Sequence, residues 1–410
     1  MEAYLQANLL GYLLDWASLL LRWLHVIVAI AWVGSSFYFV WLDNHLTPPT
    51  DANLRDKGVA GELWAVHGGG FYNPQKYLGA PPSLPPHLHW FYWESYSTWM
   101  SGFALFTVVY LLNPKTYLID PAVANLSSPV AVIVALGFLA SGWLVYDSLC
   151  RLFGQRDKAL SYAVAALVAA AAWLACHLFA GRAAFLLIGA MIATIMSANV
   201  FFWIIPGQRK VVAAIQAGAP VDPVHGQRGK QRSVHNTYFT LPVLFAMLSN
   251  HYGMTYGHAQ NWLVLVLIMV AGVLVRQFFI LRHKGKTNWT FPLAAIVVLT
   301  GVAIWIAPKP AAPLNDSTVL SPQQHFAAVK KVIQARCVQC HSAKPTLLDF
   351  PAKGLLLDQD AVIKEKAQLI YQQVVQQKLM PLGNLTAITD DERAVIAAWV
   401  EQAGTPPSDK

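Results

Sequence analysis

Long apolar runs constrain this chain more than any other feature of its sequence. Segments of about twenty apolar residues, the length that a helix needs to cross a bilayer, recur along its first three quarters. Of all residues, 56% are hydrophobic and only 12% are charged, too apolar for a soluble domain. The sequence therefore predicts an all-α fold, an eight-span transmembrane helical bundle over residues 1–307. The predicted spans cover residues 16–42, 91–112, 130–150, 159–179, 183–205, 238–251, 262–281 and 291–307.

Basic residues are distributed unequally between the two sets of connecting loops. The loops after the first, third, fifth and seventh spans hold fourteen lysines and arginines, Arg232 among them, whereas the opposite set holds Lys115 and Arg182. Cytoplasmic loops carry the basic excess in membrane proteins, so we predict a bacterial inner-membrane protein with both termini periplasmic. This orientation explains the net charge of +8, and no nucleic-acid partner is expected. No cleavage site follows the first run, so we expect the amino terminus to be retained.

A five-residue motif near the carboxyl end indicates a covalent cofactor. Cys337-Val338-Gln339-Cys340-His341 is the attachment signature of haem c. The two thiols would form thioethers with the porphyrin, and His341 would bind the iron. Met380 is the expected second ligand, and the Met/His pair is typical of electron-carrying cytochromes c. Half of a zinc site or a redox dithiol is the weaker interpretation, because the other two cysteines, Cys150 and Cys176, lie in distant apolar segments.

Local signals around this motif predict a small all-α domain over residues 321–410. The Pro-rich segment 308–320 predicts an extended linker after the last span. Capping boxes at Ser321–Gln324 and Thr389–Glu392 predict the starts of two helices, the first of which leads into the motif. The loop charges place this cytochrome c domain in the periplasm, where haem c is attached, so two independent arguments agree.

Polar groups within the predicted spans divide into two sets, because such groups are costly in a bilayer and are functional candidates. The periplasmic set contains His25, His177 and His251, with Arg22 one turn from His25. A haem b held by His25 and one of the others, with Arg22 reaching a propionate, would lie beneath the cytochrome. The alternative is that these histidines hydrogen-bond between helices. The run from Leu24 to Gly34 resembles the first helix of some haem-binding membrane oxidases.

The cytoplasmic set predicts a substrate site. It contains Asp43, Glu94, Asp147, His235, Asn236 and Arg276. The long first loop adds an HGGGFY run at residues 67–72 and an aromatic run that contains His89. Aromatic rings can stack a planar substrate while histidines and carboxylates act as acid and base. The alternatives are an interfacial aromatic belt and, for the glycines, a plain turn.

Four long segments together resemble the bacterial membrane-bound urate oxidases, also called urate hydroxylases. They are residues 22–44, the HGGGFY run, residues 89–99 (HWFYWESYSTW) and residues 232–252. The resemblance covers essentially the whole chain. It implies an eight-span membrane domain joined to a carboxy-terminal cytochrome c, with urate hydroxylated to 5-hydroxyisourate. It does not imply which membrane residues catalyse the reaction.

The residues fit this activity in outline. We expect Arg276 or an arginine of the loop between spans five and six to bind the urate anion, and His89 or His235 to remove a proton. Glu94 or Asp43 would orient the base or a water molecule. Electrons would pass through haem c to a soluble periplasmic cytochrome c or a terminal oxidase, without hydrogen peroxide. A quinol-oxidising electron-transfer subunit and a purine transporter with an appended cytochrome remain as alternatives.

Overall fold

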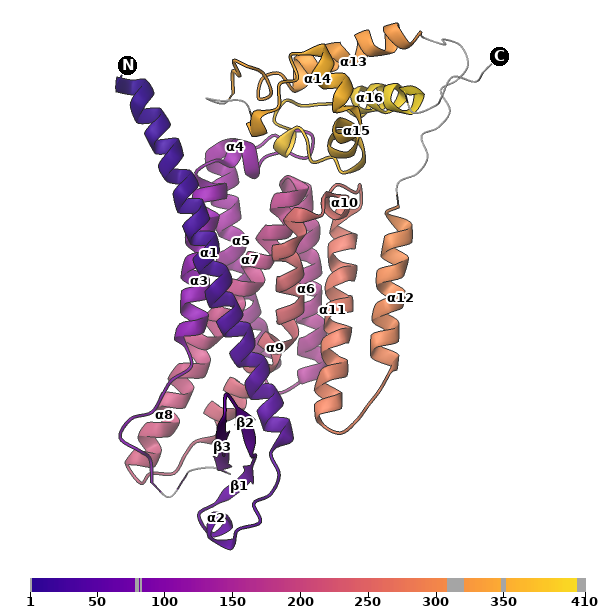
Figure 1. Ribbon diagram of the computed structural model, residues 1–410. Helices are drawn as coiled ribbons and strands as arrows, with labels where there is room; N and C mark the ends of the chain where they lie inside the picture. The colour runs from indigo at the N-terminus through magenta and orange to yellow at the C-terminus, as the bar shows by residue number, and fades with distance from the viewer. Residues whose placement is uncertain (1, 78–80, 82, 308–320, 348–351, 404–410) are drawn as a thin grey trace.

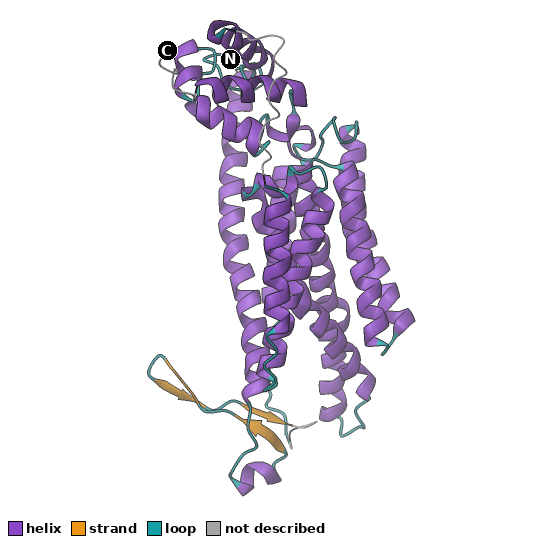
Figure 2. Ribbon diagram, turned by 90° about the vertical axis from the view of Figure 1, so that its right-hand side faces the viewer, coloured by secondary structure: helices purple, strands orange, loops and turns teal. Residues whose placement is uncertain are grey.

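The computed structural model describes residues 2–77, 81, 83–307, 321–347 and 352–403. Long helices run side by side in a bundle, which we define as residues 2–307 (Figures 1 and 2). A group of short helices, residues 321–403, lies at one end and is called the C-terminal lobe. The amino-terminal end of the first helix lies at this same end of the bundle (Figure 1). The predicted linker, residues 308–320, lies outside the described residues.

A helix occupies each of the eight predicted spans. In chain order these helices are α1 (Glu2–His45), α3 (Trp93–Phe106) with the π-helical turn η1 (Thr107–Leu111), α5 (Ser128–Phe153), α6 (Asp157–Leu178), α7 (Gly181–Asn199), α9 (Pro223–Leu248), α11 (Asn261–His283) and α12 (Thr290–Trp305). A second π-helical turn, η2 (Val200–Ile204), continues α7 into α8 (Ile205–Gln216). The helix over the sixth predicted span is longer than the span itself, because α9 begins fifteen residues earlier, at an Asp222 cap followed by Pro223.

Five of the described helices are long and apolar enough to cross a membrane. They are Tyr12–His45 of α1, α5, α6, the continuous run Gly181–Gln216 and α11. By contrast, α3 has 14 residues, α12 has 16, and α9 begins with a polar stretch. The membrane crossing of these three helices stays a prediction.

The bundle is built around α7, whose side chains are buried along most of its length. Small residues let its neighbours approach closely. A Cβ placed on Gly189 would lie 2.7 Å from the Cβ of Ala246 on α9, and one on Gly142 of α5 would lie 2.4 Å from Met191. The same helix therefore contacts both α5 and α9, which bring polar residues to it near the end opposite the lobe.

The first loop contains short strands that the all-α prediction missed. After α2 (Ala52–Asp56), strand β1 (Val59–Glu62) pairs with β4 (Gln75–Tyr77), and β2 (Ala65–His67) pairs with β3 (Gly70–Tyr72). Gly68 and Gly69 join β2 to β3 with φ angles of +57° and +80°, which glycine adopts without strain. Gly68 and Gly69 of the HGGGFY run thus form a hairpin turn, which agrees with the plain turn given above as the alternative to a role in the substrate site.

The C-terminal lobe packs short helices around its own apolar cluster. Both predicted capping boxes are confirmed: Ser321 and Gln324 bond reciprocally at 3.3 and 2.8 Å, and so do Thr389 and Glu392 at 3.2 and 2.9 Å. The elements of the lobe are α13 (Pro322–Arg336), η4 (Ala352–Gly354), α14 (Asp360–Glu365), α15 (Ala367–Ile370), η5 (Tyr371–Gln376), η6 (Leu382–Asn384) and α16 (Asp390–Ala403).

Candidate functional site

A cavity of about 430 Å³ lies among α1, α3, α7, α8 and α9 at the end of the bundle opposite the lobe. This volume falls within the range of small-molecule sites. Four residues predicted for the substrate site, Asp43, His89, Glu94 and Asn236, line it together. Four aromatic side chains add flat walls: Trp32, Phe39, Trp90 and Phe91. The π-helical turn η2 contributes Val200 and Ile204 to the lining.

A second cavity, of about 550 Å³, adjoins the first. The two cavities share five lining residues: His89, Trp90, Ile204, Gln208 and Ser233. The second is also lined by His225 and Lys230, and the guanidinium of Arg209 lies 6.0 Å from the ring centre of Trp90. Basic side chains attract an anionic ligand toward such an opening.

The Asp43 carboxylate is less available to orient a base or a water molecule than the sequence suggested. Its carboxylate accepts a 2.8 Å hydrogen bond from Lys76 of β4, and both side chains are about half exposed. An exposed pair of this kind contributes little to stability. It does give the β1–β4 hairpin a contact with the end of α1, next to the cavity.

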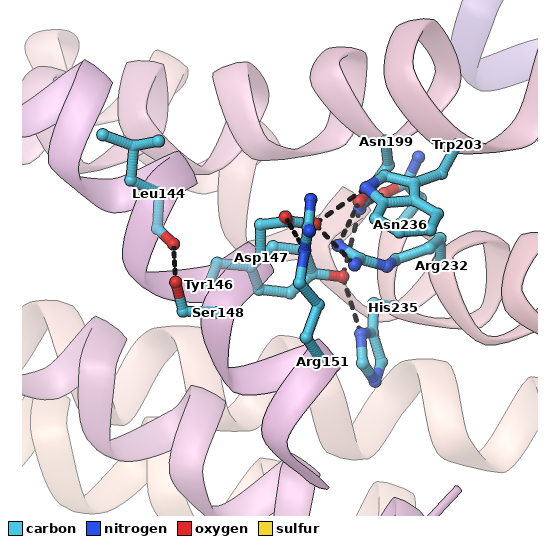
Figure 3. Close-up of polar contacts among 10 residues, drawn as sticks. All are labelled: Leu144, Tyr146, Asp147, Ser148, Arg151, Asn199, Trp203, Arg232, His235 and Asn236. Atoms are coloured by element: carbon cyan, nitrogen blue, oxygen red, sulfur yellow. Dashed lines mark hydrogen bonds and ion pairs between the residues drawn. The ribbon is translucent and has the colours of Figure 1, made fainter. Parts of the chain in front are cut away.

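Behind the cavity wall lies a buried polar network (Figure 3). Arg232 of α9 is 2% exposed, and its Nη2 donates to Asp147 of α5 at 2.6 Å. The same carboxylate accepts bonds from Arg151 and from Trp203, both at 2.7 Å. The Arg232 guanidinium also lies 4.8 Å from the ring centre of Trp203. Arg232 is therefore no loop residue, as the count of loop charges assumed, and no free anion-binding group.

Asn199 of α7 connects this ion pair to the cavity. Its Oδ1 accepts from Arg232 at 3.1 Å, and its Nδ2 donates to Tyr146 at 3.1 Å and to Oδ1 of Asn236 at 2.9 Å. Asn236, which lines the cavity, also donates to the carbonyl of Met196 at 3.0 Å. These bonds fix the Asn236 amide, while one N–H and one lone pair remain free on it.

His235 and Arg276, also predicted for the substrate site, are not among the described residues that line either cavity. The Tyr146 hydroxyl accepts from Asn199, which leaves its proton for Nδ1 of His235, 2.7 Å away. Arg276 is 5% exposed over the ring of Phe37, and its Nε and Nη2 have no hydrogen-bond partner among the described atoms.

The three histidines predicted for a haem b lie on different elements. His25 of α1 is half-buried, with Nδ1 3.1 Å from the Ser101 hydroxyl and with Gly102 closely beneath its ring. His177 is exposed near the end of α6, where Nδ1 bonds to the Trp173 carbonyl, and His251 is exposed in η3 (Ser249–His251). Arg22 bonds to Ser18 of its own helix.

The CVQCH motif follows α13 as a tight turn. The amides of Cys340 and His341 both donate to the Cys337 carbonyl, at 3.1 and 2.9 Å, which gathers the three side chains. Nδ1 of His341 bonds to the Ala352 carbonyl at 3.2 Å, so Nε2 is the nitrogen left for iron. Met380 packs against the same apolar cluster as Cys337. This donor set fits a haem c held by the two cysteines, His341 and Met380.

The thiols do not resemble a redox dithiol. Burial raises the pKa of Cys337 to about 12 and also raises the pKa of Cys340. Reactive dithiols need a lowered thiol pKa. Among the described residues, no group of three or more histidine, cysteine, aspartate or glutamate side chains is placed to hold a metal ion.

Sequence reasoning missed Tyr146, Asn199 and Trp203 as members of the polar network. Asn199 lies within an apolar span, so the rule that flagged the other polar groups applies to it as well. Tyr146 and Trp203 carried no such signal, because aromatic residues are common in apolar spans.

Comparison with protein families gives one result. The family described as urate oxidase N-terminal matches residues 11–307, which include both cavities and the polar network. Searches with the chain match no curated protein and no solved structure. Since the match covers well over half of the sequence, this chain belongs to the urate oxidase N-terminal family.

Proposed function

We propose that this protein is a membrane-bound urate hydroxylase that oxidises urate to 5-hydroxyisourate in the 430 Å³ cavity. Urate and water give the product, two protons and two electrons, so the atoms and charges balance without oxygen as a reactant and without hydrogen peroxide. Haem c, when bound, supplies one-electron transfer toward a periplasmic acceptor, either a soluble cytochrome c or a terminal oxidase. The proposed topology is eight spans with both termini and the lobe in the periplasm.

The observation that carries this proposal is the Asn236 amide at the cavity wall. Its remaining N–H and lone pair match the alternating N–H and carbonyl groups along the edge of urate. Trp32, Phe39, Trp90 and Phe91 supply faces on which a purine ring stacks. The family match independently points to urate.

Other residues at or near the cavity have proposed roles that follow from their positions. His89 lines both cavities and is exposed, so it can exchange a proton with solvent while it faces the substrate. Glu94 is half-buried in the same wall and would orient the attacking water. Arg209 of α8, beside Trp90, is the arginine between the fifth and sixth predicted spans best placed to draw in the anion. His235 acts through Tyr146 and Asn199 on the position of Asn236.

Arg276 and the periplasmic histidines have weaker support in this proposal. Arg276 is buried without a partner among the described atoms, which leaves it as a cation for an anionic group near α1. A haem b held by His25 with His177 or His251 would shorten the path to the lobe. The exposed positions of the last two histidines do not favour it over hydrogen bonding between helices.

Urate added anaerobically to the purified, haem-loaded protein tests the proposal. We expect the haem c absorption to change to that of the reduced form. Absence of reduction in protein that dithionite reduces normally would rule out urate oxidation. Reduction by a quinol instead would support the electron-transfer subunit.

His89→Ala tests the proton acceptor. A general base contributes about 10²–10⁴-fold to a rate, so we expect the rate of haem reduction by urate to fall by about a hundredfold. His87→Ala is the matched control, since His87 is an exposed histidine of the same loop that lines neither cavity. Equal rates for both variants and the wild type would assign the base to another residue.

A further inference from the structure

The segment that carries Met380 joins the apolar clusters of the bundle and the lobe. Leu379 packs against the bundle core, whereas its neighbour Met380 packs against the core of the lobe. The amides of both residues donate to the Gln373 carbonyl, at 2.8 and 3.1 Å, which closes the chain back on η5. Consecutive side chains thus belong to two different cores.

Two glycines of the bundle make room for this segment. Gly253 begins α10 (Gly253–Tyr256), a single helical turn at the lobe end of α11, and Gly257 follows its end. A Cβ on Gly253 would lie 2.7 Å from the Gln377 carbonyl oxygen and 2.9 Å from Leu379. A Cβ on Gly257 would lie 2.8 Å from the Gly253 carbonyl oxygen of its own helical turn, 3.3 Å from the Gln377 oxygen and 3.7 Å from the Cβ of Lys378. Any side chain at Gly253 would therefore displace the lobe.

A second contact lies beside the first. The short helix α4 (Pro114–Tyr117) of the bundle contacts η6 of the lobe, which directly follows Met380 and Pro381. Arg393 of α16 donates to the carbonyls of Val374 and Met380 and so holds the segment in place. Burial lowers the pKa of Arg393, whereas the carboxylates of Asp390 in the lobe and, to a smaller extent, Asp120 in the bundle raise it.

We propose that the surface formed by Gln377, Lys378, Leu379 and η6 is the face through which electrons enter the lobe from the bundle. This inference rests on the proposed function and adds the surface at which electrons would pass from the bundle to the lobe. The segment that supplies the expected iron ligand is the one seated on the bundle. In contrast, α13, which leads into CVQCH, lies on the side of the lobe farther from the bundle (Figure 1).

A disulfide across this contact tests the docking in the full-length, haem-loaded protein. Disulfides form at Cβ separations of about 3.5–4.5 Å, which the Gly257–Lys378 pair meets. We expect the Gly257→Cys/Lys378→Cys variant to cross-link under mild oxidation, detected by gel mobility before and after reduction. Gly257→Cys/Lys331→Cys is the matched control, because exposed Lys331 lies on the distant α13. Adding Gly253→Leu to the first pair should abolish its cross-link.

The rate of haem reduction by urate in the cross-linked protein tests the electron route. We expect this rate to equal that of the two single-cysteine variants, because the docked state is the one that receives electrons. Cross-linking no more efficient than in the Lys331→Cys control would overturn the docking. Efficient cross-linking with loss of urate-driven reduction would overturn the route. No reduction by urate in any variant, with cross-linking intact, would instead refute the proposed function.

Discussion

The Cys337→Ser/Cys340→Ser variant is expected to lose all covalently attached haem and all reduction by urate. Both effects follow from removal of the two thioether bonds, which only these cysteines of the motif can form. Haem staining of a denaturing gel and the visible absorption spectrum measure attachment. Binding of urate to the bundle should persist, because both cavities lie at the end opposite the lobe.

The control for this loss is Cys150→Ser/Cys176→Ser, which removes the two buried cysteines of the bundle. We expect it to keep its haem. Met380→Ala separates ligation from attachment: haem staining should be unchanged, while the reduction potential should fall because the thioether ligand favours ferrous iron. Haem staining that survives in the double serine variant of the motif would contradict the proposed attachment.

The second large effect, a loss of folding stability, is expected when Asp147 is replaced. Asp147→Leu leaves Arg232 as an unpaired charge that is 2% exposed, and breaking a buried ion pair in this way costs about 3–5 kcal/mol. Replacing both partners, in Asp147→Leu/Arg232→Met, removes that charge and should recover most of the stability. The double-mutant cycle measures the coupling directly.

Cys150 provides a probe for this experiment. It is 5% exposed and lies one helical turn beyond Asp147 on α5. In a Cys176→Ser background with haem attached, the temperature at which Cys150 reacts with a maleimide reports unfolding of this region. Arg151→Ala is the control, since its side chain is 68% exposed and such pairs contribute at most about 1 kcal/mol. Equal losses for Asp147→Leu and Arg151→Ala would contradict a dominant role for the buried pair.

Apolar runs and capping motifs in the sequence were enough to predict most of the helices of this fold. Helix positions followed from the length of apolar runs, and both capping boxes in the lobe formed as their spacing predicted. Asp43, His89 and Glu94 come from different segments, yet they share one cavity because each lies at the same end of its helix or loop. The alternation of spans is enough to predict that arrangement.

Pairing across the bundle could not be predicted in this way. Arg232 was counted as a loop residue because the first residues of α9 are polar and do not show the pattern of a membrane helix. Only the fold brings it to Asp147, which lies 85 residues earlier in the chain. Arg228 and Lys230 lie on the same helix, and removing all three from the loop count leaves eleven basic residues against two, so the predicted orientation is unchanged. The packing of residues 377–379 against Gly253 and Gly257 likewise depends on tertiary contact, for which the sequence carries no periodic signal.

The Arg232–Asp147 pair has a consequence for the order in which the chain is assembled. During synthesis α5 leaves the ribosome well before α9, so Asp147 must enter the lipid without Arg232. On translocon scales an aspartate costs about 2.5–3.5 kcal/mol at a helix centre, and the cost is lower near a helix end, where Asp147 lies in α5. Arg151, four residues further along the same helix, already bonds to Asp147 and lies near the end of α5. Arg151 can therefore pair with the Asp147 carboxylate before α9, which carries Arg232, has been synthesised.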